Sequence, residues 1–322
     1  MGTPGRGEDP LRMYRRYALG AAVLALVLLG TACSKSGGSA GGGTIASTFV
    51  FGAPPDCPTN PFCQIGLKNV YGITFKEVKK LDFGGPLTIS GLKSGAIQVG
   101  ELFSTSVYDP TFVVLEDDKH LEAADNLVPL VRASVDSPDI DAILNSVMAK
   151  LTTDTVLQLN KQYDVNKVSA ADIANGFIAA VGLKGPATTT GAGKTLTVGV
   201  SAGFNEQLIL AEMFKVLLEN AGYTVNTQES LESRKVSDPA LFSGQIDIKV
   251  EYLSSESIQN DPTAKTSGDP ANNEQILKGI MSAKGVNVLD FSPAADVNVF
   301  VVTKATADKY HLTKVSDLAK PA

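Results

Sequence analysis

The chain has 322 residues, of which 43% are hydrophobic and 19% are charged. This length is enough for one large domain or two modest ones. The formal net charge of −6 argues against a nucleic-acid-binding surface and fits an acidic protein that stays in solution.

Residues 1–33 are typical of a lipoprotein signal peptide. A stretch with four arginines precedes an uncharged apolar run at 17–29, which is shorter than the about 20 residues that span a bilayer. Gly30-Thr-Ala-Cys33 then resembles a lipobox, in which Cys33 would be acylated and become the mature N-terminus. An ordinary cleaved signal peptide with an unmodified Cys33 is the alternative, and Met13 is an alternative start.

Residues 34–45 are rich in glycine and serine and predict a flexible tether. About eleven such residues give a root-mean-square reach of roughly 18 Å. We therefore expect an extracytoplasmic protein that is anchored to the cell membrane by an N-terminal lipid.

Cys57 and Cys63 are the two remaining cysteines. An even pair in an exported chain predicts a disulfide, and closing this short loop should stabilise the fold by roughly 2 kcal/mol. A zinc half-site is the alternative, but the sequence offers no second Cys or His pair to complete four ligands.

Residues 46–183 alternate between predicted strands and helices. We expect strands at 48–51, 73–81, 97–103, 112–115 and 126–131, with short helices at 66–71 and 87–93. Three longer helices should follow, beginning at Ser137-Pro138, Thr153 and Ser169. Residues 184–194 have the composition of a linker.

The part of the chain after the linker alternates in the same way. We expect strands at 196–200, 223–225, 246–250, 286–289 and 297–302, and helices at 207–220, 238–242, 274–283 and 315–320. This pattern predicts an α/β protein with mainly parallel sheets.

The part of the chain before the linker and the part after it each contain a block of recognisable sequence motifs. The later block opens with the strand 195–200 and then Gly203-Phe-Asn-Glu-Gln207, and the earlier block contains 51–57 and Asp82-Phe-Gly-Gly-Pro86. Both blocks resemble the substrate-binding proteins of glycine betaine/choline (osmoprotectant) ABC importers, in which the segment like 203–207 lies near the mature N-terminus. The chain therefore resembles a circular permutant of that family, with 184–194 joining the ancestral termini.

The resemblance implies a two-lobed fold of the type II periplasmic-binding-protein kind. Two strands would cross between the lobes, near 112–126 and 293–304. The smaller lobe would consist of 46–115 plus 304–322 and the larger lobe of 116–303. The resemblance also implies that Phe49 and Pro321 lie close together, which would make a permutation tolerable.

Ligand-binding residues are implied by the same motifs. The residues that the resemblance assigns to the site are Phe204, Gln207, Tyr252, Asp296, Asn298, Gly84, Gly85, Ser104, Thr105 and Tyr108. Quaternary ammonium groups bind to aromatic faces, each contributing about 0.5–2 kcal/mol. The chain has no Trp, and Asn298 stands where some members have a tyrosine, so the aromatic cage departs from the family pattern.

The function that these observations predict is solute capture for an ABC importer. The protein would bind a quaternary amine or a similar small solute in a cleft between the lobes and deliver it to a permease and its ATPase. We expect no catalytic residue, metal site or cofactor, because His120 and His311 lie in charged or polar segments and no nucleophile pairs with a base. The alternatives are a sensory or surface lipoprotein with the same fold, or an importer component for another small polar solute.

Overall fold

The structure is a computed structural model that describes residues 43–55, 57–82, 84–185, 189–201, 204–229, 231 and 233–322. The expected signal peptide, Cys33 and residues 34–42 of the expected tether lie outside the described residues, as do Gly203 and linker residues 186–188. Residues 42–322 form one compact unit. Among the described helices, none is both long and apolar enough to cross a membrane.

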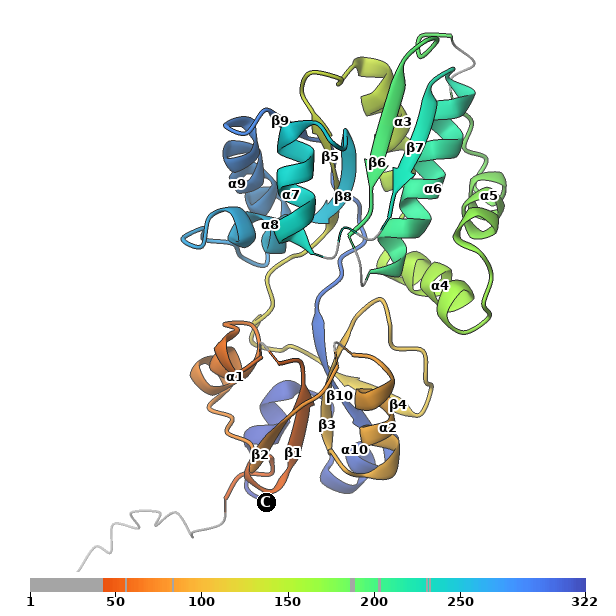
Figure 1. The fold of residues 1–322 in the computed structure, drawn as a ribbon. Helices are drawn as coiled ribbons and strands as arrows, with labels where there is room; N and C mark the ends of the chain where they lie inside the picture. Colours follow the sequence, from red (N-terminus) through yellow and green to blue (C-terminus); the bar gives the residue numbers. More distant parts are fainter. Residues whose placement is uncertain are drawn as a thin grey trace, which may run out of the picture. The chain divides into compact units, whose positions relative to one another are not determined.

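Ten strands and ten α-helices make up the described part of the chain (Figure 1). The strands are β1 (Val50–Ala53), β2 (Glu77–Lys80), β3 (Val99–Phe103), β4 (Phe112–Leu115), β5 (Leu127–Arg132), β6 (Thr195–Gly199), β7 (Thr224–Gln228), β8 (Ile248–Tyr252), β9 (Val286–Val288) and β10 (Asn298–Thr303). The α-helices are α1 (Gln64–Tyr71), α2 (Pro86–Ser94), α3 (Pro138–Met148), α4 (Thr153–Asp164), α5 (Ala170–Ala180), α6 (Asn205–Asn220), α7 (Arg234–Ser243), α8 (Leu253–Asn260), α9 (Pro270–Ser282) and α10 (Lys304–Tyr310). Three short 3-10 helices are η1 (Ala46–Thr48), η2 (Cys57–Thr59) and η3 (Val315–Ala319).

The strands form two sheets of five. The first sheet has the order β2-β1-β3-β10-β4, in which β1 is parallel to β2 and β3 while β10 is antiparallel to β3 and β4. The second has the order β7-β6-β8-β5-β9, with β6 parallel to β7 and β8 and with β5 antiparallel to β8 and β9. We call the part built on the first sheet the first lobe (43–115 and 298–322) and the part built on the second sheet the second lobe (127–288).

The two sheets have equivalent strand orders. In each sheet the fourth strand, β10 or β5, directly follows a segment that crosses from the other lobe. The crossing segments, 116–126 and 289–297, lead into β5 and β10 (Figure 1). They run beside each other, since Asn126 bridges Ala295 and the Asp296 amide donates to the Asp125 carbonyl over 3.0 Å. The predicted two-lobed α/β fold with two crossings is therefore confirmed.

The boundary at 303 that the sequence suggested for the larger lobe differs from the structure. Strand β10 hydrogen-bonds to β3 and β4 in the first sheet, so 298–303 lies with the smaller lobe. The crossing chain becomes part of the sheet that it enters, where it satisfies the backbone groups of two neighbouring strands.

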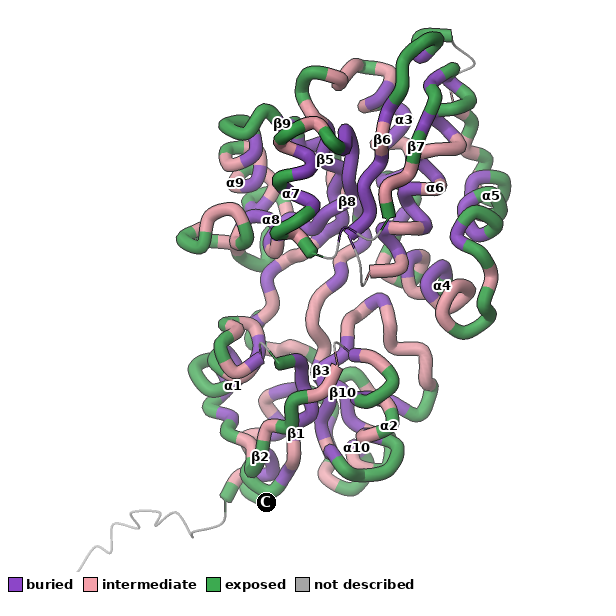
Figure 2. The backbone as a smooth tube through the Cα atoms, viewed as in Figure 1, coloured by how far each residue is buried: buried purple, intermediate pink, exposed green. Residues whose placement is uncertain are grey.

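Helices cover both faces of each sheet, and the strands β1, β3, β5 and β8 are largely buried, whereas the edge strands β2 and β7 are more exposed (Figure 2). In the second lobe, α3 to α6 share one apolar cluster with the sheet, and α7 to α9 share another. In the first lobe, α1, α10 and η3 pack on one face and α2 on the other. Parallel strands with both faces covered are the usual consequence of helical crossovers.

The two ends of the described chain lie next to each other. Thr44 forms an antiparallel bridge with Pro321, and the Ala322 amide donates to the Gly43 carbonyl over 2.9 Å. The C-terminal segment also contributes Leu312, Val315 and Leu318 to the first-lobe core. The end of the chain therefore completes the lobe that the start of the chain begins.

Candidate functional site

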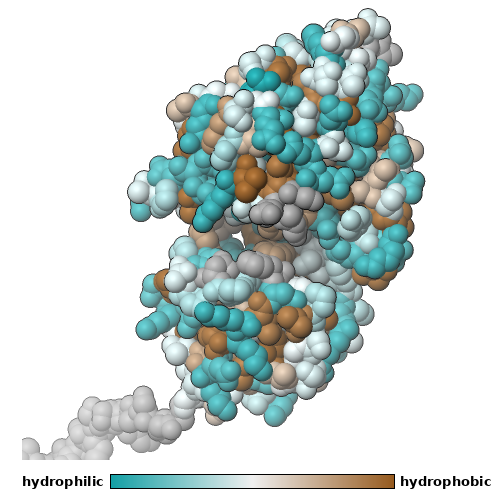
Figure 3. All heavy atoms as spheres, viewed as in Figure 1, coloured by the Kyte–Doolittle hydropathy of each residue, from teal (hydrophilic) through white to brown (hydrophobic). Residues whose placement is uncertain are grey.

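The carboxyl ends of β1 and β3 in one lobe and of β6 and β8 in the other supply residues to two adjoining cavities. Ligands of open α/β sheets bind at this end of the strands, where the loops leave the sheet. The first cavity has a volume of about 240 Å³ and the second of about 450 Å³. Phe103, Phe204 and Asp296 line both cavities. A hollow in this region is visible on the face drawn in Figure 3.

Four aromatic side chains of the described residues line the first cavity, two from each lobe. Phe62 and Phe103 belong to the first lobe, and Phe204 and Tyr252 to the second. The centroid of the Phe204 ring is 5.9 Å from that of Phe103 and 5.3 Å from that of Tyr252. Ring faces of this kind attract organic cations.

Tyr252 is held in place by a buried carboxyl group. Its hydroxyl donates to Glu206 Oε1, and Glu206 Oε2 accepts from Asn160 Nδ2 over 2.9 Å. Burial raises the pKa of Glu206, although these two donors oppose the shift. Burial together with nearby Glu206 and Asp296 raises the pKa of Tyr252, so its hydroxyl stays a donor.

Arg234, at the start of α7, brings a guanidinium group to the first cavity. Its Nε lies 2.8 Å from Glu251 and 3.5 Å from Glu256, and its Cζ lies 5.5 Å from the centre of the Tyr252 ring. Glu251 belongs to a buried cluster of charges on the face of β8 that packs against α7 and α8. Glu251 and Glu256, which do not line the cavity, therefore largely neutralise the positive charge of Arg234.

Lys249 is the cation at the centre of that cluster. Its ammonium group contacts Asp238 and lies 3.0 Å from Glu251 and 3.3 Å from Glu256. Burial opposes its charge, but the three carboxylates raise the pKa of Lys249 above its ordinary value. These carboxylates lie close enough together to hold a metal ion, and the ammonium group already occupies the place of a cation among them.

The crossing segments bring further carboxyl groups to the first cavity. Asp125 accepts from the amides of Ser254 and Ser255, over 2.7 and 2.9 Å, and so caps the start of α8. Asp296 accepts from the Thr105 hydroxyl over 2.7 Å. Burial and Glu206 raise the pKa of Asp296, and burial raises the pKa of Asp125.

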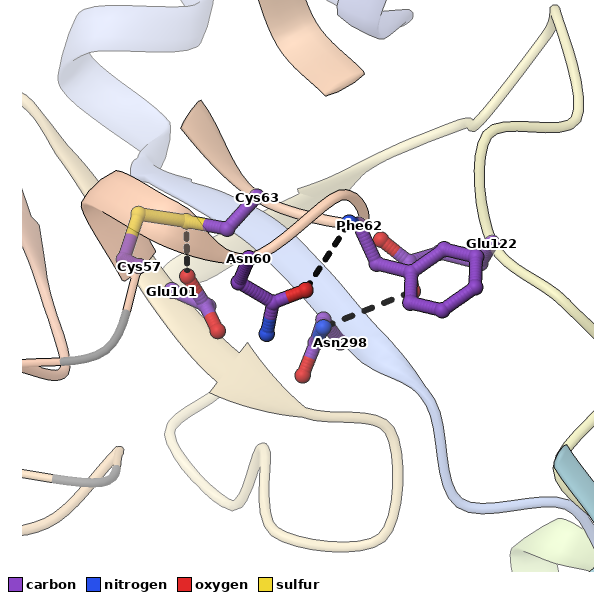
Figure 4. Close-up of a disulfide and its surroundings, with 7 residues drawn as sticks. All are labelled: Cys57, Asn60, Phe62, Cys63, Glu101, Glu122 and Asn298. Carbon is purple, nitrogen blue, oxygen red and sulfur yellow. Dashed lines mark hydrogen bonds between the residues drawn. A yellow bond between two sulfur atoms is a disulfide. The ribbon is translucent and has the colours of Figure 1, made fainter. Parts of the chain in front are cut away.

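The predicted disulfide joins Cys57 and Cys63, whose Cα atoms are 5.2 Å apart, within the ordinary range (Figure 4). The loop that it closes contains Asn60 and Phe62, and both line the first cavity. Asn60 Oδ1 accepts from the Phe62 amide over 2.9 Å. The disulfide therefore holds one wall of the candidate site in addition to closing a loop.

The glycine-rich turn before α2 has a clear structural role. Asp82 accepts from the amides of Gly85, Leu87 and Thr88 over 2.8–3.2 Å, which caps the helix. Gly84 has a φ of +67°, and a Cβ there would lie 3.3 Å from the Leu102 backbone. The turn is thus pressed against β3 at the edge of the second cavity.

Most of the residues expected in the site lie at one of the two cavities. Tyr252 and Asn298 line the first; Gly84, Gly85, Thr105 and Tyr108 line the second; Phe204 and Asp296 line both. Gln207 and Ser104 line neither. Gln207 is buried and accepts from the Ser201 amide, while the Ser104 hydroxyl bonds within the crossing region.

Several cavity residues were not found from the sequence. Phe62, Glu101, Glu122, Asp125 and Arg234 carry no motif that marks them. Phe62 lies inside the Cys57–Cys63 loop, so an expectation that this loop faces the cleft would have found it. The others come together only because the crossing segments, β3 and α7 meet in space.

The family to which this architecture belongs is shown by comparison with known proteins. A family model described as the substrate-binding domain of ABC-type glycine betaine transport systems matches residues 46–180 and 194–322. The chain therefore belongs to this family and is an ABC-importer substrate-binding protein rather than an enzyme.

Solved structures that resemble the chain include other solute-binding proteins. An ancestral arginine-binding protein bound to arginine is 15% identical, with 85% of this chain and 92% of that chain covered and a TM-score of 0.38. A probable amino-acid ABC transporter extracellular-binding protein from Bacillus subtilis is 12% identical, with 84% and 89% covered and a TM-score of 0.42. PhnD1 from Prochlorococcus marinus in complex with methylphosphonate is 11% identical, with 85% and 83% covered and a TM-score of 0.40. Because these TM-scores are below 0.5, the family assignment depends on the family model.

Proposed function

We propose that this protein captures a glycine betaine- or choline-like compatible solute between its lobes and delivers it to an ABC permease. The observation that carries the proposal is the first cavity, to which each lobe contributes two aromatic rings. Of the sequence-predicted residues, Phe204, Tyr252, Asp296 and Asn298 would contact the solute there. Closure of two lobes around a small molecule excludes water and strengthens every polar contact inside.

Isothermal titration tests this function directly. The full chain, purified in dodecyl maltoside, is titrated with glycine betaine, proline betaine, choline and carnitine. We expect saturable binding of at least one of them, and Phe204→Ala should weaken it by about tenfold because one cation-attracting face is lost. No heat from any of the four, in a sample that unfolds cooperatively, would remove the osmoprotectant assignment and leave a binding protein for another solute.

We also propose that Cys33 carries the lipid that retains the protein at the outer face of the cell membrane. The basic and apolar segments before Cys33 and the glycine-rich segment after it support this localisation. Metabolic labelling with an alkyne-bearing fatty acid should mark the wild-type protein but not Cys33→Ala. Labelling of the variant would contradict the anchor.

A surface or sensory role without a permease is the second candidate function, and permease and ATPase genes next to the gene of this protein would argue against it.

The order of the two halves supports a further part of the proposal, which is that the chain is a circular permutant. The family model matches in two blocks separated by residues 181–193, and the ends of the described chain are hydrogen-bonded to each other. Both sheets have the same strand order, so opening the chain before β1 or before β6 gives the same topology. A permutation of this kind leaves every strand pairing unchanged.

A further inference from the structure

We propose that the first cavity selects solutes of net positive charge over zwitterions, and that Glu122 is the residue that makes this selection. The inference rests on the proposed function, because it names the class of solute that the same cavity takes. It distinguishes between the cationic and the zwitterionic solutes that the proposed function allows.

The charged groups around the first cavity are mostly negative. Among the described residues, four carboxyl groups line it, from Glu101, Glu122, Asp125 and Asp296, against one guanidinium, that of Arg234. That guanidinium is already paired with Glu251 and Glu256 outside the cavity. A solute in the cavity therefore meets more acidic groups than basic ones, and a cation bound there would stabilise the ionised form of these carboxyl groups.

Glu122 is a carboxyl group of the cavity wall with a buried oxygen that no described residue satisfies. Its Oε2 accepts a long hydrogen bond of 3.4 Å from Asn298 Nδ2, and its buried Oε1 has no hydrogen-bond partner among the described residues. Neither oxygen belongs to an ion pair in that part of the chain. A buried carboxylate without a partner is costly, and the cost is removed when a cation binds beside it.

The groups that face Glu122 come from its own crossing segment, from β3 and from the start of β10. They are Glu101, Asp117 and Asp125, which repel a negative charge, and the neutral amide of Asn298. Burial, followed by these three carboxyl groups, raises the pKa of Glu122 well above its ordinary range. A bound cation would reverse this balance, since it stabilises the ionised form.

The aromatic rings and the acidic groups act on the same kind of ligand. Figure 4 shows Phe62, Glu122 and Asn298 together beside the disulfide, with Glu101 on the neighbouring strand. Ring faces attract a cation without hydrogen bonds, and carboxylates add a net charge preference. A zwitterion would gain from the rings but would bring its own carboxylate toward Glu101 and Glu122, unless that carboxylate reached Arg234.

Choline and glycine betaine test the inference because they share a trimethylammonium group and differ in net charge. Both are titrated into the full chain in dodecyl maltoside. We expect choline to bind at least tenfold more tightly than glycine betaine. Glu122→Gln should lower the affinity for choline by about tenfold and leave the affinity for glycine betaine unchanged or higher. Glu122→Asp should keep the preference for choline.

Glu116→Gln is the matched control, because Glu116 lies on the same crossing segment and its side chain is 65% exposed. It should change neither affinity, and the melting temperatures of all variants should confirm that they are folded. Equal or tighter binding of betaine, or an equal loss of both ligands in Glu122→Gln, would overturn the inference and leave the proposed function in place. If neither ligand binds the folded protein, the osmoprotectant function itself fails, and this inference fails with it.

Discussion

At the scale of single residues, the second lobe depends on charges that are buried rather than exposed. Strand β8 alternates Ile248, Val250 and Tyr252 with Lys249 and Glu251. Such alternation usually indicates a strand with one solvated face. Here the charged face packs against α7 and α8, whose Asp238 and Glu256 complete an ion cluster with Lys249 and Glu251.

Replacing Lys249 with Met should destabilise the protein strongly. The change leaves three buried carboxyl groups without their shared cation, and breaking a buried charge cluster costs about 3–5 kcal/mol. Urea unfolding followed by circular dichroism measures the free energy of unfolding. The matched control is Lys278→Met, because Lys278 pairs with Glu274 at a site where it is 40% exposed, and we expect a change of at most about 0.5 kcal/mol there. Equal stabilities of the two variants would contradict the role of the cluster.

The stability of the ligand-free protein should decline as the pH rises through about 8. Burial and Glu251 raise the pKa of Glu256 to about 8, so this side chain favours folding in its neutral form. A carboxyl group whose pKa is raised on folding stabilises the protein fully below its unfolded pKa and loses that contribution as the pH rises through its folded pKa. Thermal melting between pH 6 and 9 measures the decline, and Glu256→Gln should flatten it. An unchanged slope in that variant would rule out Glu256 as its source.

The same reasoning predicts a pH dependence of cation binding. The raised pKa of Glu122 means that protons compete with the solute for its carboxylate. The affinity for choline should therefore fall as the pH is lowered from 8 to 5, and titrations across this range measure the fall. Glu122→Gln should lack most of this dependence, and a wild-type affinity that does not change with pH would contradict proton competition.

At the scale of structural elements, the C-terminal segment is part of the first-lobe core. Helix α10 and η3 contribute Ala307, Leu312, Val315 and Leu318 to the cluster that contains Phe49 and Phe51. The start and the end of the described chain thus share one core, although 250 or more residues separate them in sequence. The bridge between Thr44 and Pro321 closes this arrangement.

Deleting residues 305–322 should unfold the first lobe and abolish solute binding, because its core loses four buried side chains. Leu318→Ala is the milder variant, and we expect it to lower the free energy of unfolding by about 2–5 kcal/mol, as for other fully buried leucines. Lys320→Ala, at an exposed position of the same segment, should have little effect. Urea unfolding and titration calorimetry measure the two properties, and a truncated protein with wild-type values would disprove this dependence.

At the scale of the whole molecule, the two sheets are equivalent in topology. Each receives one antiparallel strand from the other lobe, so neither has to come first in the chain. A chain with its two halves in the opposite order would then share the same core, crossings and cleft with the present one. The positions of the termini are the main difference between them.

A chain with the halves exchanged tests this equivalence. The variant begins at Lys194, continues from Ala322 through an Asn-Gly turn to Gly43, and ends at Gly185. Residues 43 and 322 are already paired in antiparallel fashion, which a two-residue turn can join. We expect the same solute affinity and a melting temperature within a few degrees of the original. Failure of this variant to fold, while the original folds under the same conditions, would contradict the permutation.

Local patterns in the sequence determined much of this protein. Helical periodicity predicted α3 to α6, the even pair of cysteines in an exported chain predicted the disulfide, and the paired motifs led to the family and its two-lobed fold. These features depend on residues that are close in sequence or on short motifs, so they can be predicted from the sequence alone. The same motifs also placed Phe204, Tyr252, Asp296 and Asn298, which come to line one cavity.

The charge of the cleft was decided only by the tertiary structure. Glu101, Glu122 and Arg234 belong to a strand, a crossing segment and a helix that are distant in sequence, and no local pattern distinguishes them from surface charges. Whether a carboxyl group is solvated or buried beside others depends on which segments pack around it. Burial and electrostatic repulsion are properties of that packing, and they determine which solutes this cavity favours.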